Sequence, residues 1–388
     1  MKFGCMLLPA SFAVLLFSIP ALAVNPPHYL VTNDDLTGNF IQNTMTVYTI
    51  GTNGQLTLTT QVDIGLTGAT GGYFAANRII ALNDSSNQCI FASDAATGTV
   101  AGVNANTLTL VGHDKGSVND TGLSNGVGLA LNGQYLYASY SDSSNIGTFQ
   151  IESDCGLSFV GDITVNGLQG GIADGMAVRG NILIATYGDG SIESFNLSSG
   201  VPVSNGDKQN STGSRAGNSY PSSIDITQDG HFAIFGDTST ATLIEVSDIS
   251  SGRLTPTVAY RALTGINSSN IMLSPDETLL YISNTQGDAI SAVFFDKTTG
   301  ILTRGCKSNL LKGYSSNFSY IAGLALASPS GNGAGVYAAE FGAPSGIAEV
   351  QVTSSDGVCS MLEAATSPVA DPNSLGLLSI ATFPPRAF

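Results

Sequence analysis

The chain has 388 residues with 13 basic and 29 acidic side chains, which gives a formal net charge of −16 at pH 7. So acidic a protein repels phosphate backbones and anionic lipids, and we expect neither nucleic acid nor phosphorylated sugars as partners. The chain has 46 glycines, no tryptophan and only 11% charged residues, which argues against long amphipathic helices and favours short strands joined by turns.

The first 23 residues have the three parts of a secretory signal peptide. Lys2 supplies the positive charge, Leu7 to Ile19 is mostly apolar, and Ala21-Leu22-Ala23 is a small-residue cleavage motif. The apolar run is too short to span a bilayer, and no later run approaches that length. We therefore expect a secreted or periplasmic monomer without a membrane span, in which residues 24–388 form one domain.

Four cysteines follow the predicted cleavage point. An even number of cysteines in an exported chain suggests two disulfides, for which three pairings are possible. Metal binding is the alternative, but no two of these cysteines have C-x-x-C spacing. We favour the pairs Cys89–Cys155 and Cys306–Cys359, because the members of each pair then lie in adjacent repeats.

The rest of the chain repeats a unit of short strands. The clearest hairpin has an apolar strand to Leu273, a Ser274-Pro275-Asp276-Glu277 turn and a second strand, Leu279–Asn284. In chain order the predicted units are 29–62, 78–112, 127–163, 176–203, 224–261, 271–304 and 323–362. Their second strands end 46 to 61 residues apart, which is a blade-sized period.

The first unit has three predicted strands, whereas the later units have four. One strand, Leu377–Phe383, is left over at the end of the chain and has the apolar character of a first strand. These observations predict an all-β fold, a seven-bladed β-propeller of four-stranded blades. In this prediction the C-terminal strand pairs into the N-terminal blade, which removes the open strand edges.

The strand and turn sequences resemble those of a known family. Tyr29-Leu-Val-Thr-Asn33, Leu280-Tyr-Ile-Ser-Asn284 and Ser274-Pro-Asp276 are similar to the YVTN-type repeat of lactonase-like seven-bladed propellers. That family includes 6-phosphogluconolactonases and carboxymuconate cyclases, so the resemblance implies a lactone-type hydrolase. The matching motifs are structural, and no motif of this chain matches the family's cationic or histidine residues.

In a propeller, the loops before the innermost strands and after the second strands open on one face of the channel. We therefore expect a binding site for a small neutral polar ligand or glycan from the polar residues at these positions. The predicted ligand-binding residues are Asn125, Ser222, Asn270, Tyr320, Asn33, Asp94, Tyr140, Tyr187 and Asn284. The alternative is that these side chains cap turns and bind backbone groups.

Asp174 and Glu340 add carboxylates to the same predicted mouth, and His113 is the histidine placed best to reach it. We predict these three residues as catalytic in a lactone hydrolase. Carboxylate and amide oxygens also suit Ca²⁺, which is the candidate cofactor and would polarise a lactone carbonyl. The competing hypothesis is a non-catalytic extracellular propeller that binds a glycan or a protein.

Overall fold

The structure of the protein is a computed structural model. It describes residues 28–36, 42–65, 77–95, 97–115, 128–140, 143–171, 173–211, 223–236, 243–261, 268–284, 288–313, 320–326, 334–341, 345–372, 374, 376 and 379–385. All regular secondary structure in these ranges is β-strand. The predicted signal peptide lies outside the described residues, and the described part of the chain holds no helix that is long and apolar enough to cross a membrane.

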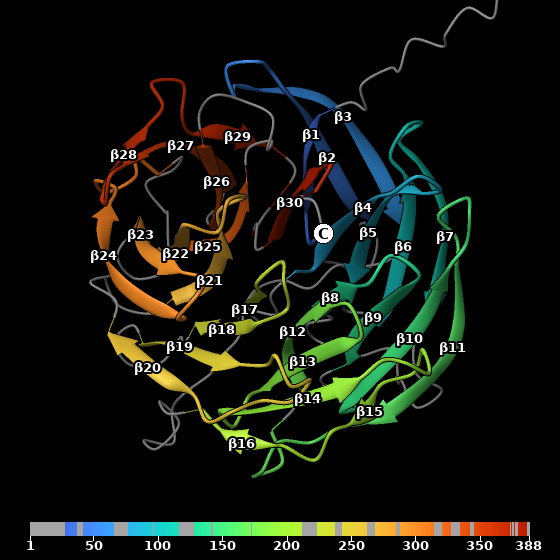
Figure 1. Ribbon diagram of the computed structural model, residues 1–388. Helices are drawn as coiled ribbons and strands as arrows, with labels where there is room; N and C mark the ends of the chain where they lie inside the picture. The colour runs from blue at the N-terminus through green and yellow to red at the C-terminus, as the bar shows by residue number, and fades with distance from the viewer. Residues whose placement is uncertain are drawn as a thin grey trace, which may run out of the picture.

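Seven antiparallel sheets surround a central channel, and Figure 1 shows them as the blades of a ring. The strands of blades 1 to 3 are β30 (Ser379–Phe383), β1 (Tyr29–Asn33), β2 (Asn43–Ile50), β3 (Leu56–Gly65); β4 (Ile79–Asn83), β5 (Gln88–Asp94), β6 (Thr99–Asn104), β7 (Thr109–Lys115); β8 (Gly128–Leu131), β9 (Tyr135–Tyr140), β10 (Asn145–Ile151) and β11 (Leu157–Thr164).

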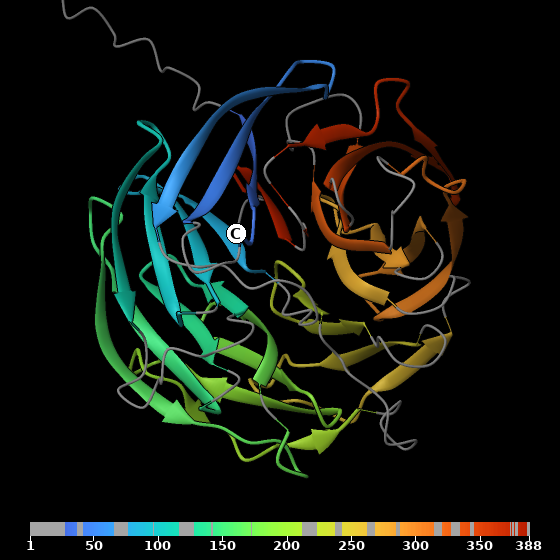
Figure 2. The same ribbon diagram turned by 180° about the vertical axis from the view of Figure 1, so that it is seen from behind.

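The remaining four blades follow in chain order, and the view from behind shows the same ring (Figure 2). Their strands are β12 (Ala173–Arg179), β13 (Ile182–Tyr187), β14 (Ser191–Asn196), β15 (Val203–Ser204), β16 (Gln209–Asn210); β17 (Ser223–Ile226), β18 (Phe232–Gly236), β19 (Leu243–Asp248), β20 (Val258–Arg261); β21 (Ser268–Leu273), β22 (Leu279–Asn284), β23 (Ala289–Asp296), β24 (Ile301–Lys307); β25 (Tyr320–Leu326), β26 (Ala334–Phe341), β27 (Ser345–Ser355), β28 (Val358–Glu363) and β29 (Val369–Asp371).

The last strand of the chain completes the first blade. β30 pairs antiparallel with β1 along its whole length, from Tyr29 opposite Phe383 to Asn33 opposite Ser379. Figure 1 shows the two strands side by side near the channel. The predicted closure of the ring is therefore confirmed, and neither strand leaves an open inner edge.

Blades 4 and 7 differ from the predicted pattern, because two short strands share the fourth position of each. In blade 4, β15 and β16 both pair with β14, and Asp207 lies between them in the chain. Asp207 accepts hydrogen bonds from the backbone N–H and the hydroxyl of Ser194. A side chain thus takes the place of a strand partner here, which divides the outer strand.

The hydrophobic core consists of layers between neighbouring blades. One layer joins Val31 and Val47 of blade 1 to Ile79 and Ile90 of blade 2. The next joins Phe91 of blade 2 to residues of blade 3. Because side chains of a strand alternate between its two faces, the period-2 pattern of the sequence places apolar residues against both neighbouring blades.

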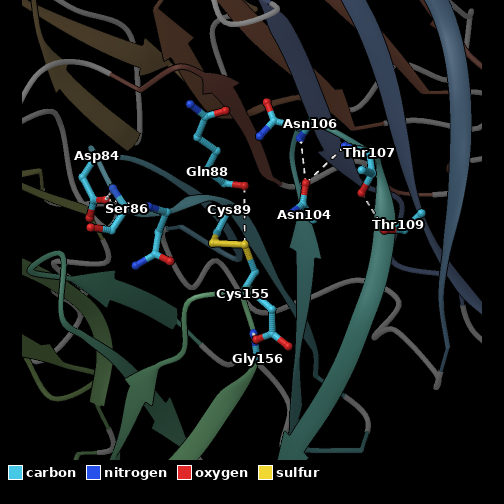
Figure 3. The surroundings of a disulfide bond; sticks show 12 residues. Asp84, Ser86, Gln88, Cys89, Asn104, Asn106, Thr107, Thr109, Cys155 and Gly156 are labelled. Atoms are coloured by element: carbon cyan, nitrogen blue, oxygen red, sulfur yellow. Dashed lines mark hydrogen bonds between the residues drawn. A yellow bond between two sulfur atoms is a disulfide. The ribbon is translucent and has the colours of Figure 1, made fainter.

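Two disulfides join consecutive blades with the pairing expected from the sequence. Cys89 of β5 is bonded to Cys155, in the turn after β10, and Cys306 of β24 is bonded to Cys359 of β28. Figure 3 shows the first of these bonds, with the carbonyl oxygen of Gln88 3.4 Å from Cys155 Sγ. Each bond therefore ties together two blades that already pack against each other.

Candidate functional site

The innermost strands of all seven blades line a cavity of about 170 Å³ in the channel. Its walls are mostly Ile, Leu, Ala, Val and Met side chains. The polar lining residues are Asn77, Arg179, Asp225 and Thr382. The channel itself is therefore an apolar space with few polar groups, which is the usual composition of a small-molecule pocket.

The starts of the innermost strands and the ends of the second strands lie on one face of the ring, as expected. The strand registers place Asn33 opposite Ser379, Tyr187 opposite Ala173 and Asn284 opposite Ser268. We call this face, where the innermost strands begin, the mouth face. Asp174 is the second residue of β12 and therefore lies at the mouth face.

Two of the predicted ligand-binding residues belong to one buried network between blades 1 and 2. Asn43 donates hydrogen bonds to Asn33 Oδ1 at 2.9 Å and to Asp94 Oδ1 at 3.0 Å. Asn33 in turn donates to the carbonyl oxygens of Arg78 and Ser93. These contacts hold the two blades together, which is the structural role that the sequence left open as an alternative.

The same junction contains a buried ion pair. Arg78 Nη2 lies 2.7 Å from Asp35 Oδ1, and both side chains are only 1% exposed. The backbone N–H of Arg78 donates to Ser379 Oγ, which joins the residue before β4 to the first residue of β30. The positive charge of Arg78 is thus buried and paired with a carboxylate of the protein itself.

Other predicted mouth residues have partners within their own blades. The hydroxyl of Tyr187 donates to Glu193 Oε2 at 2.8 Å, and Asn284 Nδ2 donates to the carbonyl oxygen of Ala289 and to Ser291 Oγ. The backbone of Asn270 exchanges hydrogen bonds with Ser283 Oγ. These groups therefore already have hydrogen-bond partners, and the role of the residues in ligand binding stays a prediction.

The other predicted site residues are spread over several blades. Tyr140 packs into the layer between blades 2 and 3, and Glu340 is 1% exposed in β26. The backbone of Tyr320 begins β25. His113 lies within β7, the outermost strand of blade 2, and not in a loop after it. Asn125 and Ser222 fall outside the described residues.

The position of His113 makes it a poor candidate for catalysis at the channel. Its backbone pairs with Ala101 of β6, and two more strands separate it from the channel. With neighbouring strands about 4.8 Å apart, it lies roughly 14 Å from the innermost strand. Its predicted catalytic role therefore gains no support from its location.

Asp174 has an unusual environment for a carboxylate. The residue is 7% exposed, and its Oδ1 atom has no hydrogen-bond partner among the described residues. A bulge in the pairing of β12 with β13 places Asp174 and Gly175 outside the regular ladder. Such bulges redirect side chains and are common beside active sites. Burial, together with the negative charge of Asp189, raises the pKa of Asp174 to about 7.

Asp189 follows the second strand of the same blade and anchors the loop that leads into β12. Its Oδ2 atom accepts the backbone N–H groups of Gln169 at 2.6 Å and Gly171 at 3.1 Å. Its Oδ1 atom accepts the backbone N–H and the hydroxyl of Ser191. Partial burial raises the pKa of Asp189, but these hydrogen bonds outweigh burial and lower it below its ordinary value.

The pKa values of Asp174 and Asp189 are thus shifted in opposite directions. Asp189 stays ionised at neutral pH, whereas Asp174 has a pKa close to neutrality and exchanges a proton there. A pair of carboxyl groups with diverging pKa values is a recurring feature of acid–base sites. Asp174 is the predicted catalytic residue whose environment best fits proton transfer.

Sequence reasoning missed Asp189. It lies in the turn Tyr187-Gly188-Asp189-Gly190, directly after a strand end that was assigned to the mouth. An aspartate between two glycines is a signal for a turn in which a carboxylate accepts backbone N–H groups. That signal locates Asp189, but the sequence does not show that Asp174 lies beside it.

The described residues hold no group of three or more His, Cys, Asp or Glu side chains arranged for a metal ion. Ca²⁺ also takes backbone and amide oxygens as ligands, and we derive no step through this ion. The expectation of Ca²⁺ stays a prediction.

The architecture defines the class of protein: the fold is a seven-bladed β-propeller. No protein-family model matches the chain, and no curated protein matches it. Among solved structures, a candidate 6-phosphogluconolactonase from Bacteroides fragilis aligns with a TM-score of 0.68 and 16% identity, over 92% of this chain and 98% of its own.

Two further structures are similar at the same low identity. A protein of unknown function from Desulfotomaculum acetoxidans has a TM-score of 0.62 and 15% identity, over 91% of this chain and 98% of its own. The periplasmic gluconolactonase of Pseudomonas aeruginosa has a TM-score of 0.55 and 16% identity, over 72% of this chain and 81% of its own. These likenesses confirm the fold that the sequence predicted, and identities this low do not carry over an activity.

Proposed function

We propose that the protein is an exported hydrolase that opens a neutral sugar lactone or a related cyclic ester, with Asp174 as the general base. The observation that carries this proposal is the buried carboxyl group of Asp174, whose pKa is raised to about 7 at the mouth face of the channel. A general base works best when its pKa lies near the working pH.

Hydrolysis of the lactone requires one group that first accepts a proton from water and then gives it to the leaving oxygen. The Asp174 carboxylate takes a proton from a water molecule while the water oxygen attacks the lactone carbonyl carbon. The tetrahedral intermediate then expels the ring oxygen, which receives the proton from Asp174 as the C–O bond breaks. The products are a hydroxy acid and a regenerated carboxylate, so one water is consumed and the base is restored.

The negative net charge of the protein favours a neutral substrate over an anionic one. The whole chain carries a net charge of −16, and Arg78, near the mouth face, is already paired with Asp35. Among the described residues of the mouth face, a phosphorylated lactone would find no free arginine, and it would meet a repulsive field. A gluconolactonase and a candidate 6-phosphogluconolactonase share the fold, and the first of these names matches this charge balance better.

Export is supported by the two disulfides, because such bonds persist in oxidising compartments. One of the structurally similar proteins is periplasmic by its name. The amino-terminal signal sequence is the third support, and detection of the mature amino terminus by mass spectrometry of exported protein tests it.

The test of the activity is the release of acid from glucono-δ-lactone and from a panel of acyl and aryl lactones, corrected for spontaneous hydrolysis. We expect turnover that the Asp174→Asn variant reduces at least about 100-fold in kcat, since a general base contributes about that factor or more. The matched control is Asp154→Asn, at an exposed turn in blade 3. Absence of turnover with every neutral lactone, or equal turnover by Asp174→Asn, would contradict the proposal.

A further inference from the structure

A second pocket, of about 290 Å³, lies between blades 5 and 6, away from the channel. The strand register places Phe232, the first residue of β18, opposite Asp248, the last residue of β19. The mouth face is at the other end of the same strands, where Gly236 pairs with Ser223. This side pocket therefore opens toward the opposite face of the ring and is separate from Asp174.

The floor of the side pocket is aromatic and rigid. The imidazole of His231 stacks on the ring of Phe232 with 4.0 Å between centroids, and Phe232 meets Phe295 of blade 6 edge to face. Gly300 of blade 6 has a φ of +71°, and a Cβ there would lie 2.8 Å from the Phe232 ring. Glycine thus allows the blade 6 turn to lie directly against the aromatic floor.

The walls supply an aromatic face and hydrogen-bonding groups. Tyr260 of β20 packs partly against the same apolar layer and lines the pocket. Thr298 and Thr299, on the exposed turn of blade 6, also line the pocket, and the Thr299 hydroxyl donates to Asp296 Oδ2 and keeps its acceptor lone pairs. Among the described residues, no lysine or arginine lines the pocket. An anionic ligand such as a phosphate ester would find no cationic partner here.

Asp248 gives the pocket a fixed acceptor. The hydroxyl and the backbone N–H of Ser250 donate to its Oδ1 atom and lower the pKa of the carboxyl group, and His231 contributes to the same shift. His231 Nε2 lies 3.3 Å from Asp248 Oδ2. With 42% of its side chain exposed, the ionised carboxylate still has lone pairs that face solvent.

We propose that this side pocket binds a neutral sugar ring. The C–H face of a pyranose packs against an aromatic ring, while neighbouring hydroxyl groups donate to a carboxylate and exchange hydrogen bonds with threonine hydroxyls. A quaternary ammonium ion also favours aromatic faces and a carboxylate. The stacking of His231 on Phe232 and the two threonine hydroxyls suit a polyhydroxylated ligand better than a cation.

Saturation-transfer NMR on the full-length mature protein tests this proposal, with the methyl glycosides of glucose, galactose, mannose and N-acetylglucosamine as probes. We expect binding of at least one glycoside, which the Tyr260→Ala and Asp248→Ala variants each weaken at least tenfold. The milder Asp248→Asn variant keeps the shape of the pocket and is also expected to bind more weakly. Thermal unfolding of each variant shows whether the fold is intact.

The control is a variant outside both proposed sites. The Asp154→Ala variant removes an exposed turn aspartate of blade 3 and should not change glycoside binding. Binding of none of the four glycosides would overturn the proposal. Equal binding by folded Tyr260→Ala and Asp248→Asn variants, or stronger binding of choline than of every glycoside, would overturn it as well.

Discussion

Asp174 and Asp189 belong to the same blade, and the charge of Asp189 acts on the carboxyl group of Asp174. The negative charge of Asp189 contributes to the raised pKa of Asp174, while Asp189 itself is kept ionised by hydrogen bonds from Ser191, Gln169 and Gly171. Burial is the larger cause of the raised pKa of Asp174, and the fixed charge of Asp189 adds to it. This arrangement is the physical basis of the proposed lactone hydrolysis.

The Asp189→Asn variant should separate this electrostatic role from a structural one. Loss of the negative charge lowers the pKa of Asp174, so the pH profile of kcat/KM should move toward lower pH. The amide can accept from only one of the two donor sets, so unfolding should also become easier by about 1–3 kcal/mol. Hydrolysis rates between pH 5 and 9 and urea unfolding measure the two effects.

Asp207→Asn is the matched control for this variant. Asp207 is a hydrogen-bonded aspartate of the same blade, and it accepts from Ser194 and from the backbone of Leu254. It does not contribute to the shift at Asp174. We expect a loss of stability without a change in the pH profile, and an equal acid shift in both variants would refute the role given to Asp189.

Protonation of Asp94 should stabilise the fold. Burial raises its pKa from 3.8 to about 7, although hydrogen bonds from Asn43 and Thr99 act in the opposite direction. Between these values the folded protein holds a proton that the unfolded chain has released. The stabilisation is complete below pH 3.8 and is lost as the pH rises through 7. The free energy of unfolding should therefore fall from pH 5 to pH 8.

The Asp94→Asn variant checks this prediction by urea unfolding at several pH values. The amide cannot ionise, so the variant should be more stable than the wild type at pH 8, by at most about 4 kcal/mol at about 1.4 kcal/mol per pKa unit. Part of the pH dependence should persist, because Asp174 titrates in the same direction. An unchanged pH dependence in Asp94→Asn would show that this carboxyl group is already ionised in the fold.

The blades, the closing strand and the disulfides were predictable from the sequence, because each follows from short sequence patterns and their order along the chain. Alternating apolar residues and turn signals define each blade, and the spare strand at 377–383 has only the first blade to complete, where β30 pairs with β1. The two disulfides follow from the same register, because each pair of cysteines lies in consecutive units. These inferences need only the order of repeats along the chain.

The partners of the side chains at the mouth face depend on contacts between residues far apart in the sequence, and the spacing of the repeats does not reveal these contacts. Asn33 and Tyr187 both end second strands, yet Asn33 binds backbone groups of the next blade and Tyr187 binds Glu193 of its own. The environment of Asp174 depends on a bulge and on a turn that the sequence pattern treats as connections. The pattern therefore predicted which strand ends form the mouth face, but it did not distinguish side chains with structural partners there from a candidate for catalysis.

The Arg78–Asp35 pair should be important for stability. Both side chains are 1% exposed, and removal of Arg78 takes away the cation that lies 2.7 Å from the buried Asp35 carboxylate. The Arg78→Met variant should therefore lose about 3–5 kcal/mol in urea unfolding. The Arg78→Met/Asp35→Asn double variant should recover a large part of this loss. The exposed Arg253→Met variant is the control and should change stability by at most about 0.5 kcal/mol.

The two disulfides should contribute similarly to stability. They join residues separated by 66 and 53 positions, and the chain-entropy relation gives about 4 kcal/mol for either loop. We expect the Cys89→Ala/Cys155→Ala and Cys306→Ala/Cys359→Ala variants to lose comparable free energies of unfolding, about 2–4 kcal/mol each. Non-reducing denaturant titrations measure this, and a loss confined to one of the two pairs would contradict the expectation.

The most direct measurement of the proposed mechanism is the pH dependence of kcat/KM for a neutral lactone, compared between the wild type and Asp174→Asn. Because a general base must be unprotonated, the rate of the wild type should rise with pH and level off above an apparent pKa near 7. The variant should be slower at least about 100-fold and should lack this inflection. A wild-type profile without an inflection near neutrality, or the same inflection in both proteins, would show that Asp174 is not the base.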